Sequence, residues 1–282
     1  MTDHPKKTPS AINYFADNPI STTSEDLLQR SKFVERIVRE IKMTDASQGY
    51  VLAVMGQWGS GKTSVLNLVK ERLSDSGTIL VEYNPWLLSG VEELVDGLFR
   101  EINAKLNKKG VKYRAAIDKI IDYGEMLTPL TSMPVVGAWA NGALMPFQMM
   151  AKRRNLRTTS VVEQKEQVAE ALTNIDSSIV VIVDDIDRLD KVEVREIFKL
   201  VRLTANFPNV IYLLSFDRIR VENALTEDGV PGRAYLEKIV QNGFEIPMIP
   251  KKVLTREVAQ ALDFALEQVN VRLDREVWDN TL

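Results

Sequence analysis

The sequence contains no cysteine, and its only histidine is His4. The absence of cysteine excludes disulfide bonds and zinc sites built on cysteine. His4 lies in a polar N-terminal stretch, so catalysis by histidine is not expected. These absences remove disulfide scaffolds, zinc modules and histidine-dependent enzymes from consideration.

A large excess of charge of one sign is also missing. The 282 residues include 36 Lys and Arg and 39 Asp and Glu, which gives a net charge of −3. This balance provides no overall reason to expect nucleic-acid binding. Residues 1–10 are polar and lack the apolar segment of a secretory signal, so we expect a cytoplasmic location. The composition, 45% hydrophobic and 27% charged, is typical of a globular protein with one large or two small domains.

What the sequence does contain is a glycine-rich loop at residues 56–63, Gly-Gln-Trp-Gly-Ser-Gly-Lys-Thr. It matches the Walker A phosphate loop, G-x-x-x-x-G-K-S/T. A short apolar run at 51–55 precedes the loop, and apolar residues recur at helical spacing after it. A strand, a glycine loop and a helix N-terminus are the setting in which such loops bind phosphate. The residues expected to bind nucleotide are Gly56, Gln57, Trp58, Gly59, Ser60, Gly61, Lys62, Thr63 and Ser64.

Two side chains of this loop have specific expected roles. Glycines let the backbone turn so that several N–H groups point at one anion. Lys62 is expected to reach the outer phosphates of ATP, and the Thr63 hydroxyl is expected to ligate Mg²⁺. The alternative, a glycine-rich turn that binds nothing, is disfavoured by the strand and helix on either side.

An acidic run follows a second apolar strand, expected at 179–183. This is a Walker B pattern, in which Asp184 would hold Mg²⁺ opposite Thr63. Asp185 is a candidate catalytic residue that orients the attacking water. Lys62 is a second candidate catalytic residue, which stabilises phosphate charge. Alone, the run would be read as a helix cap and a solvated turn, but the phosphate loop upstream favours the metal site. Two roles stay open for Asp187 and Arg188: they form a structural ion pair, or they serve the site of a neighbouring subunit.

A further strand, expected at 209–214, also ends in polar residues. Ser215 or Asp217 could sense the γ-phosphate of ATP. Arg218 is a candidate catalytic arginine finger that would compensate charge on the transferred phosphoryl group. The alternative for Arg218 is a turn with a surface salt bridge.

Strands that alternate with helices predict a mainly parallel α/β sheet in a three-layer α/β/α arrangement, with a helical insertion and a partial C-terminal helical region. We expect a flexible lead at 1–16, an NTPase domain at 17–250 and the start of a helical region at 251–282. The insertion, at about 108–177, is the part of the chain with the least regular pattern. Expected helices cover 25–43 (with Ser24 as N-cap), 62–73, 91–107, 160–174, 194–203 and 253–271, and a strand is expected at 78–83.

Several motifs together resemble the KAP family of P-loop NTPases, which belongs to the STAND-like branch of the additional-strand ATPases. The resemblance rests on Trp58-Gly59 in the loop, on the segment 83–90 with Asn84-Pro85-Trp86, and on the acidic run 184–189. Later segments at 215–218 and 235–241 also resemble the family. The likeness covers residues 17–250 and is weakest in the insertion.

The resemblance implies a sheet with an extra strand between the Walker A and Walker B strands. It also implies ATP, Mg²⁺ and a role in switching or assembly, and some bacterial members are ATPase subunits of anti-phage defence systems. Trp86 is expected to pack between the strand and a helix. Two roles stay open for Trp58: it covers the phosphates, or it anchors the loop against a partner surface.

An uncharged stretch at 126–151 lies where family members often carry transmembrane helices. It is long enough to span a bilayer, but it contains Pro129, Pro134 and Pro146. A single span would also put the two halves of the NTPase domain on opposite sides of the membrane. We expect an apolar loop or helical hairpin that packs on a partner subunit or on a second copy in a homo-oligomer, with membrane docking as the alternative.

Other functions remain open from the sequence. A nucleotide-gated scaffold with little turnover is the main alternative to an ATPase. A small-molecule kinase is less favoured, because no second acidic substrate motif is evident. Basic clusters at 108–119 and 152–157 leave nucleic-acid binding open, although both are local and fit solvated faces equally well.

Overall fold

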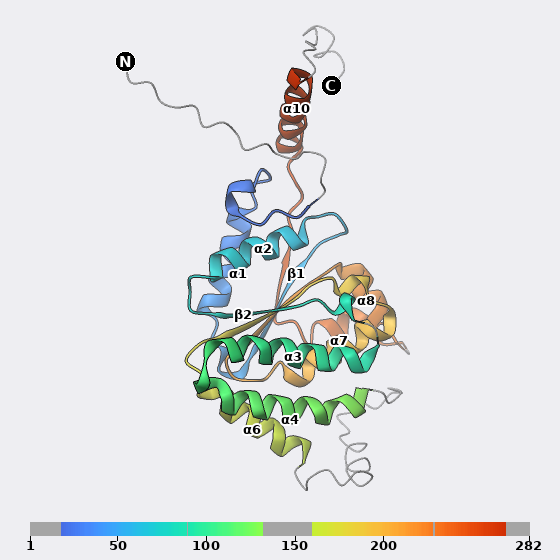
Figure 1. Ribbon diagram of the computed structural model, residues 1–282. Helices are drawn as coiled ribbons and strands as arrows, with labels where there is room; N and C mark the ends of the chain where they lie inside the picture. Colours follow the sequence, from blue (N-terminus) through green and yellow to red (C-terminus); the bar gives the residue numbers. More distant parts are fainter. Residues whose placement is uncertain (1–17, 89, 132–159, 228, 269–282) are drawn as a thin grey trace, which may run out of the picture.

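The computed structural model describes residues 18–268 except 89, 132–159 and 228 (Figure 1). The α-helices are α1 (Ser31–Met43), α2 (Lys62–Leu73), α3 (Val91–Lys109), α4 (Arg114–Thr131), α6 (Val161–Thr173), α7 (Lys191–Thr204), α8 (Arg218–Leu225), α9 (Gly232–Leu236) and α10 (Lys251–Gln268). The strands are β1 (Tyr50–Met55), β2 (Ile79–Tyr83), β3 (Ile179–Val183), β4 (Val210–Phe216) and β5 (Asn242–Glu245). Short 3₁₀ turns are η1 (Thr23–Glu25), η2 (Ala46–Gln48), η3 (Pro85–Leu87), η4 (Val111–Tyr113) and η5 (Ile186–Arg188).

In the described part of the chain, five strands form one sheet in the order β2-β3-β4-β1-β5, and every pairing is parallel. Strand β4 lies between β1, which leads into the phosphate loop, and β3, which leads into the acidic run. This order confirms the extra strand that the family resemblance implied. Strands β1, β3 and β4 are almost wholly buried, as apolar strands covered on both faces must be.

Helices cover both faces of the sheet, which confirms the predicted three-layer α/β/α class (Figure 1). Leu52 and Val54 of β1 face the layer formed by α1 and α2. Val51 and Ala53, which alternate with them, face the layer that contains α3, α7 and α8. The larger second layer is extended outward by α4 and α6, which lie beyond α3 in Figure 1.

The first part of the insertion is more regular than expected, because α4 is a long helix packed on α3. Gly124 allows close approach, since a Cβ there would lie 2.9 Å from the Phe99 ring. Tyr123 places its ring edge-on to Phe99 and Phe207, so α4 joins the main core. The predicted helix at 160–174 is confirmed as α6. Only the start of the uncharged stretch lies in α4, and the rest falls in residues 132–159, outside the described part.

No helix in the described residues is long and apolar enough to cross a membrane. Two basic residues of the insertion contact neighbours in the same chain. Lys112 forms an ion pair with Asp176 at 3.3 Å, and Lys119 donates a hydrogen bond to Gln167 at 2.7 Å. These contacts account for part of the basic cluster at 108–119 as local structure.

The predicted start of the first helix was wrong. The expected helix from Glu25 is instead the short turn η1, and α1 begins only at Ser31. Gln29 has a φ of 58°, a left-handed conformation that interrupts a right-handed helix. Asp26, rather than Ser24, accepts hydrogen bonds from the backbone N–H groups of Arg30 and Ser31 at 2.9 Å. The carboxylate of Asp26 therefore satisfies the amides at the start of α1.

Gly49 lies just before β1, the strand that leads into the phosphate loop. Its close approach to the end of α7 can be tested by substitution. Its φ is 71°, and a Cβ there would lie 1.9 Å from the Ala205 carbonyl oxygen at the end of α7. Gly77 has a similar φ of 74°, but a Cβ there would meet nothing within 4 Å. We expect Gly77→Ala to lower the free energy of unfolding by about 1 kcal/mol through φ alone. Gly49→Ala should lower it by at least about 3 kcal/mol, because a backbone clash is added.

Chemical denaturation of the two variants measures this difference. Equal losses for Gly49→Ala and Gly77→Ala would show that the close approach of Gly49 to α7 does not contribute.

Candidate nucleotide site

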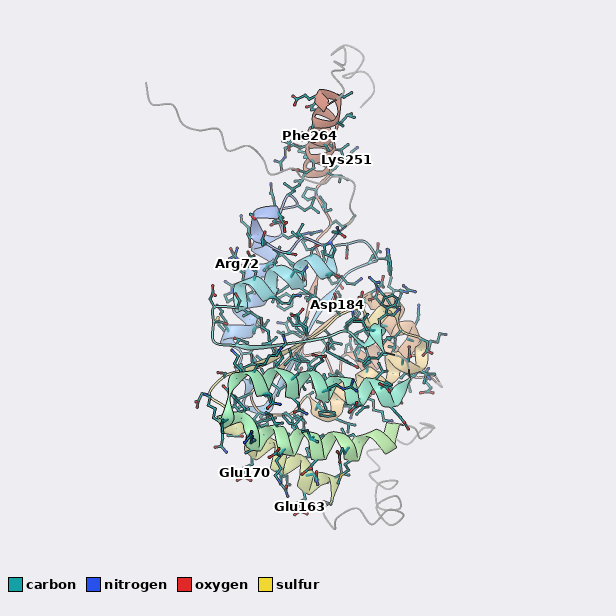
Figure 2. All side chains as sticks on the ribbon, in the orientation of Figure 1. Arg72, Glu163, Glu170, Asp184, Lys251 and Phe264 are labelled. Carbon is teal, nitrogen blue, oxygen red and sulfur yellow. The ribbon has the colours of Figure 1, made fainter. Side chains whose placement is uncertain are left out.

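The expected site residues meet at the carboxyl edge of the sheet. The phosphate loop follows β1, the Asn84-Pro85-Trp86 segment follows β2, and the acidic run follows β3. Because β2, β3, β4 and β1 are neighbours in this order, their C-terminal ends share one edge. Figure 2 labels Asp184 at this edge, between the α2 layer and the α3 layer. Ligands of open parallel sheets bind at such edges.

The loop backbone has the conformation that its glycines were expected to supply. Gly59 and Gly61 have φ values of 76° and 88°, which strongly favour glycine. The loop closes on itself where the Ser60 N–H donates to the Gln57 carbonyl oxygen at 3.1 Å. Helix α2 then begins at Lys62, and no side chain of the described residues caps its N-terminus. The free amides and the helix dipole make this N-terminus suited to an anion.

The Lys62 ammonium lies back across its own loop. Its Nζ atom donates to the Gly56 carbonyl oxygen at 3.1 Å and lies 3.4 Å from an Asp187 carboxylate oxygen. The Lys62 side chain is only 10% exposed, and that of Asp187 is 2% exposed. A buried ion pair therefore holds the lysine at the mouth of the phosphate loop. Asp187 thus forms an ion pair within the chain, but its partner is Lys62 rather than Arg188, which pairs with Asp185.

Thr63 and Asp184 meet across the boundary between α2 and β3. The Thr63 hydroxyl donates a hydrogen bond to Oδ2 of Asp184 at 3.0 Å. The second oxygen of Asp184 accepts the backbone N–H of Asp185 at 2.9 Å. A hydroxyl and a carboxylate at this distance can share one hard cation, because Mg²⁺ prefers oxygen ligands.

Asp185 sits in an unusual local conformation beside this pair. Its φ is 60°, which is uncommon for a residue other than glycine and is best tolerated by Asp and Asn. The Asn84 amide donates to Oδ2 of Asp185 at 2.9 Å, and the Arg188 guanidinium forms an ion pair with Oδ1 at 2.6 Å. Both carboxylate oxygens are therefore engaged from different loops.

Arg188 also contacts two tryptophans. Its guanidinium lies 5.0 Å from the ring centre of Trp58 and 5.1 Å from that of Trp86. The two residues are 64% and 50% exposed. The prediction that Trp86 packs between the strand and a helix was therefore wrong: a half-exposed indole faces a guanidinium instead. Such cation–π contacts are strongest with tryptophan.

The end of β4 distinguishes the two candidates for sensing the γ-phosphate. Ser215 lies inside the strand rather than after it, is fully buried, and its Oγ has no hydrogen-bond partner among the described residues. It alternates with Leu214 and Phe216, which face the α3 layer, so it faces the α2 side. Asp217 instead caps α8 by accepting the backbone N–H groups of Ile219 and Arg220.

Arg218, the candidate arginine finger, forms ion pairs with two carboxylates of its own chain. It donates to Glu222 at 2.8 Å and to Glu245, at the end of β5, at 2.9 Å. These two carboxylates raise the pKa of the guanidinium. The contacts match the salt-bridge alternative.

The residues present fit a nucleoside triphosphate with Mg²⁺. The uncapped N-terminus of α2 and Lys62 provide positive charge, while Thr63 and Asp184 provide oxygen ligands. The side-chain oxygens Ser60 Oγ, Asp187 Oδ1 and Ser215 Oγ are buried without a partner in the described part of the chain. Buried polar atoms are nearly always satisfied, so a ligand with its metal and water is a reasonable source of partners.

Comparison with protein families matches residues 30–282 to the KAP family P-loop domain. The chain belongs to the KAP family. A curated relative, the Phage T7 exclusion protein of Escherichia coli, is 29% identical over an alignment of 285 positions, and the match covers 90% of this chain. The chain spans 38% of the length of that relative.

Solved structures with a similar course of the chain have low sequence identity to this KAP domain. A Walker-type ATPase of Pyrococcus abyssi is 12% identical, with a TM-score of 0.47, and the match covers 92% of this chain and 63% of that chain. AMPPCP-bound DnaA from Aquifex aeolicus is 16% identical, with a TM-score of 0.36, and the match covers 90% of this chain and 56% of that chain.

One residue near the site of this KAP domain was missed by sequence reasoning. Arg30 is 7% exposed, and its guanidinium donates to the carbonyl oxygens of Pro247 and of Ser60 in the phosphate loop. Burial lowers the pKa of Arg30, and the nearby Asp26 partly opposes this shift. The contacts tie the loop to the segment that leads into α10. A lone arginine before a helix carries no sequence signal for such a role.

Proposed function

We propose that this KAP domain binds ATP with Mg²⁺ at the phosphate loop and hydrolyses the ATP. The observation that carries the proposal is the 3.0 Å hydrogen bond between Thr63 of the loop and Asp184 after β3. Two motifs that are 121 positions apart in the sequence thus form one candidate metal site. Family membership supports the same conclusion.

Each residue has a role in this proposal. Mg²⁺, when bound, would neutralise phosphate charge and orient the terminal phosphate. Lys62 and the amides at the start of α2 bind the phosphates, and Thr63 and Asp184 supply metal ligands. Asp185 orients the attacking water, and the buried Ser215 hydroxyl provides a hydrogen bond near the terminal phosphate. Arg218 stays a weaker candidate, because two carboxylates already pair with it.

We further propose that ATP binding and hydrolysis drive a change in conformation or assembly that contributes to exclusion of phage. The similarity to the Phage T7 exclusion protein supports this role. The insertion at 108–177 is the proposed contact with partner subunits or with a second copy. The second candidate is a scaffold gated by nucleotide with little turnover. It is favoured by the engagement of both Asp185 oxygens, which leaves fewer acceptor positions for water.

Light scattering with and without ATP–Mg²⁺, combined with phosphate-release assays, tests the proposal. We expect steady ATP turnover and a larger mass in the presence of ATP–Mg²⁺. A larger mass with ATP–Mg²⁺ but no turnover would favour the scaffold. A folded protein with neither turnover nor a nucleotide-dependent change in mass would contradict both the ATPase and the scaffold.

A further inference from the structure

The Arg188 guanidinium connects three segments that are distant in the sequence. It touches Trp58 in the phosphate loop, Trp86 after β2 and Asp185 after β3. The Arg188 side chain is 35% exposed, so its position depends on these contacts rather than on enclosure in a core. We name the group formed by Trp58, Arg188 and Trp86 the tryptophan clamp.

The clamp acts on the residue proposed to orient water. Arg188 forms an ion pair with Oδ1 of Asp185, while the Asn84 amide donates a hydrogen bond to Oδ2. A carboxylate has a limited number of acceptor positions, and a charged guanidinium is a strong competitor for one of them. The left-handed backbone of Asp185 also restricts the rotamers that its side chain can adopt.

One residue of the clamp, Trp58, belongs to the loop that would bind phosphate. Trp58 lies between Gly56 and Gly61, in the segment whose backbone surrounds the candidate anion site. A loop that adjusts around a ligand would carry the Trp58 ring with it, and a cation–π contact weakens when the ring leaves the guanidinium. Trp86 lies on a separate loop, in η3 after β2.

We propose that Arg188 is a positioning residue that restrains Asp185 while it is held between Trp58 and Trp86, and that occupation of the phosphate loop loosens this restraint. The clamp thereby couples nucleotide binding to the availability of the Asp185 carboxylate. The inference rests on the proposed ATPase function of the same site and adds a way in which this site is regulated.

The test uses the chain with Trp139 and Trp278 replaced by Phe, so that fluorescence reports only Trp58 and Trp86. A non-hydrolysable ATP analogue with Mg²⁺ is the probe, and ATP turnover is measured in parallel. We expect the analogue to change the emission of the parent chain, and Arg188→Ala to abolish most of this change. Arg188→Ala should also raise turnover by about fivefold at ATP concentrations well below saturation and change it little at saturation, because bound nucleotide no longer has to loosen one partly exposed ion pair.

Trp86→Leu provides a second variant, because Trp86 is half exposed and its loss should not disturb the core. It should raise turnover in the same direction, and the double variant with Arg188→Ala should gain little more. Arg233→Ala is the matched control, since Arg233 forms a comparable 2.8 Å pair with Glu237 on the surface. It should change neither emission nor turnover.

The outcomes separate the inference from the proposed function. A parent chain that binds no analogue refutes the proposed function. A parent chain that binds and hydrolyses ATP, with turnover at subsaturating ATP unchanged or reduced in Arg188→Ala and Trp86→Leu, refutes the restraint alone. Additive effects of the two substitutions would also refute it, because they would show that the residues do not act through one contact.

Discussion

Replacing Lys62 with Ala is expected to weaken binding of ATP–Mg²⁺ by roughly 10- to 100-fold, as loss of a charged hydrogen bond to phosphate predicts. Turnover should fall at least as far. The loop itself should survive, because its turn depends on Gly59, Gly61 and the hydrogen bond from Ser60 to Gln57. Calorimetric titration with ATP–Mg²⁺ measures the change in affinity.

The substitution has a predictable side effect that a second variant removes. Asp187 is buried beside Lys62, so Lys62→Ala leaves a buried carboxylate without its cation and should lower stability. Lys62→Ala combined with Asp187→Asn should restore much of that stability without restoring nucleotide binding. Lys42→Ala, at an exposed position on α1, is the control for loss of one positive charge. A double variant that binds ATP–Mg²⁺ as tightly as the parent chain would contradict the role of Lys62.

The second large effect is expected from Asp185→Asn. Turnover should fall by about 10²- to 10⁴-fold, the usual contribution of a residue that handles a proton or orients water. Affinity for ATP–Mg²⁺ should change by less than about threefold, because Thr63 and Asp184 keep their contact. Asn tolerates the left-handed backbone at this position, so the substitution preserves the local conformation.

Single-turnover kinetics measures the loss of turnover, and an equilibrium binding titration measures the affinity for ATP–Mg²⁺ separately. Asp176→Asn is a matched control, because Asp176 is an exposed carboxylate that pairs only with Lys112 among the contacts described above. If Asp185→Asn keeps the turnover of the parent chain, Asp185 does not orient water, and another residue of the site must do so. If neither chain turns over ATP but both bind it, the scaffold hypothesis is favoured.

The sequence predicted those parts of the fold and site that depend on local pattern. Apolar runs ending in glycine or acid marked β1 and β3, and apolar residues at helical spacing marked α2. The meeting of Thr63 and Asp184 could also be expected, because a motif pair defines it. Family resemblance, rather than pattern, supplied the position of β4 between β1 and β3.

The contacts that the sequence did not predict depend on side chains from separate loops. Nothing local to Trp86 indicates that its ring lies beside Arg188, because the sheet order brings their loops together. The late start of α1 depends on Gln29 adopting a left-handed conformation, which helical periodicity does not detect. Arg30 reaches the phosphate loop only after the chain has folded around Pro247.

The central claim is that residues 56–63, with Asp184, form a site for ATP and Mg²⁺. Isothermal titration calorimetry of the 282-residue chain with ATP, with Mg²⁺ or with EDTA, tests it most directly. We expect saturable binding that weakens in EDTA and that weakens by roughly 10- to 100-fold when Lys62→Ala is combined with Asp187→Asn. A folded chain that gives no saturable binding, or a double variant that binds as tightly as the parent chain, would contradict it.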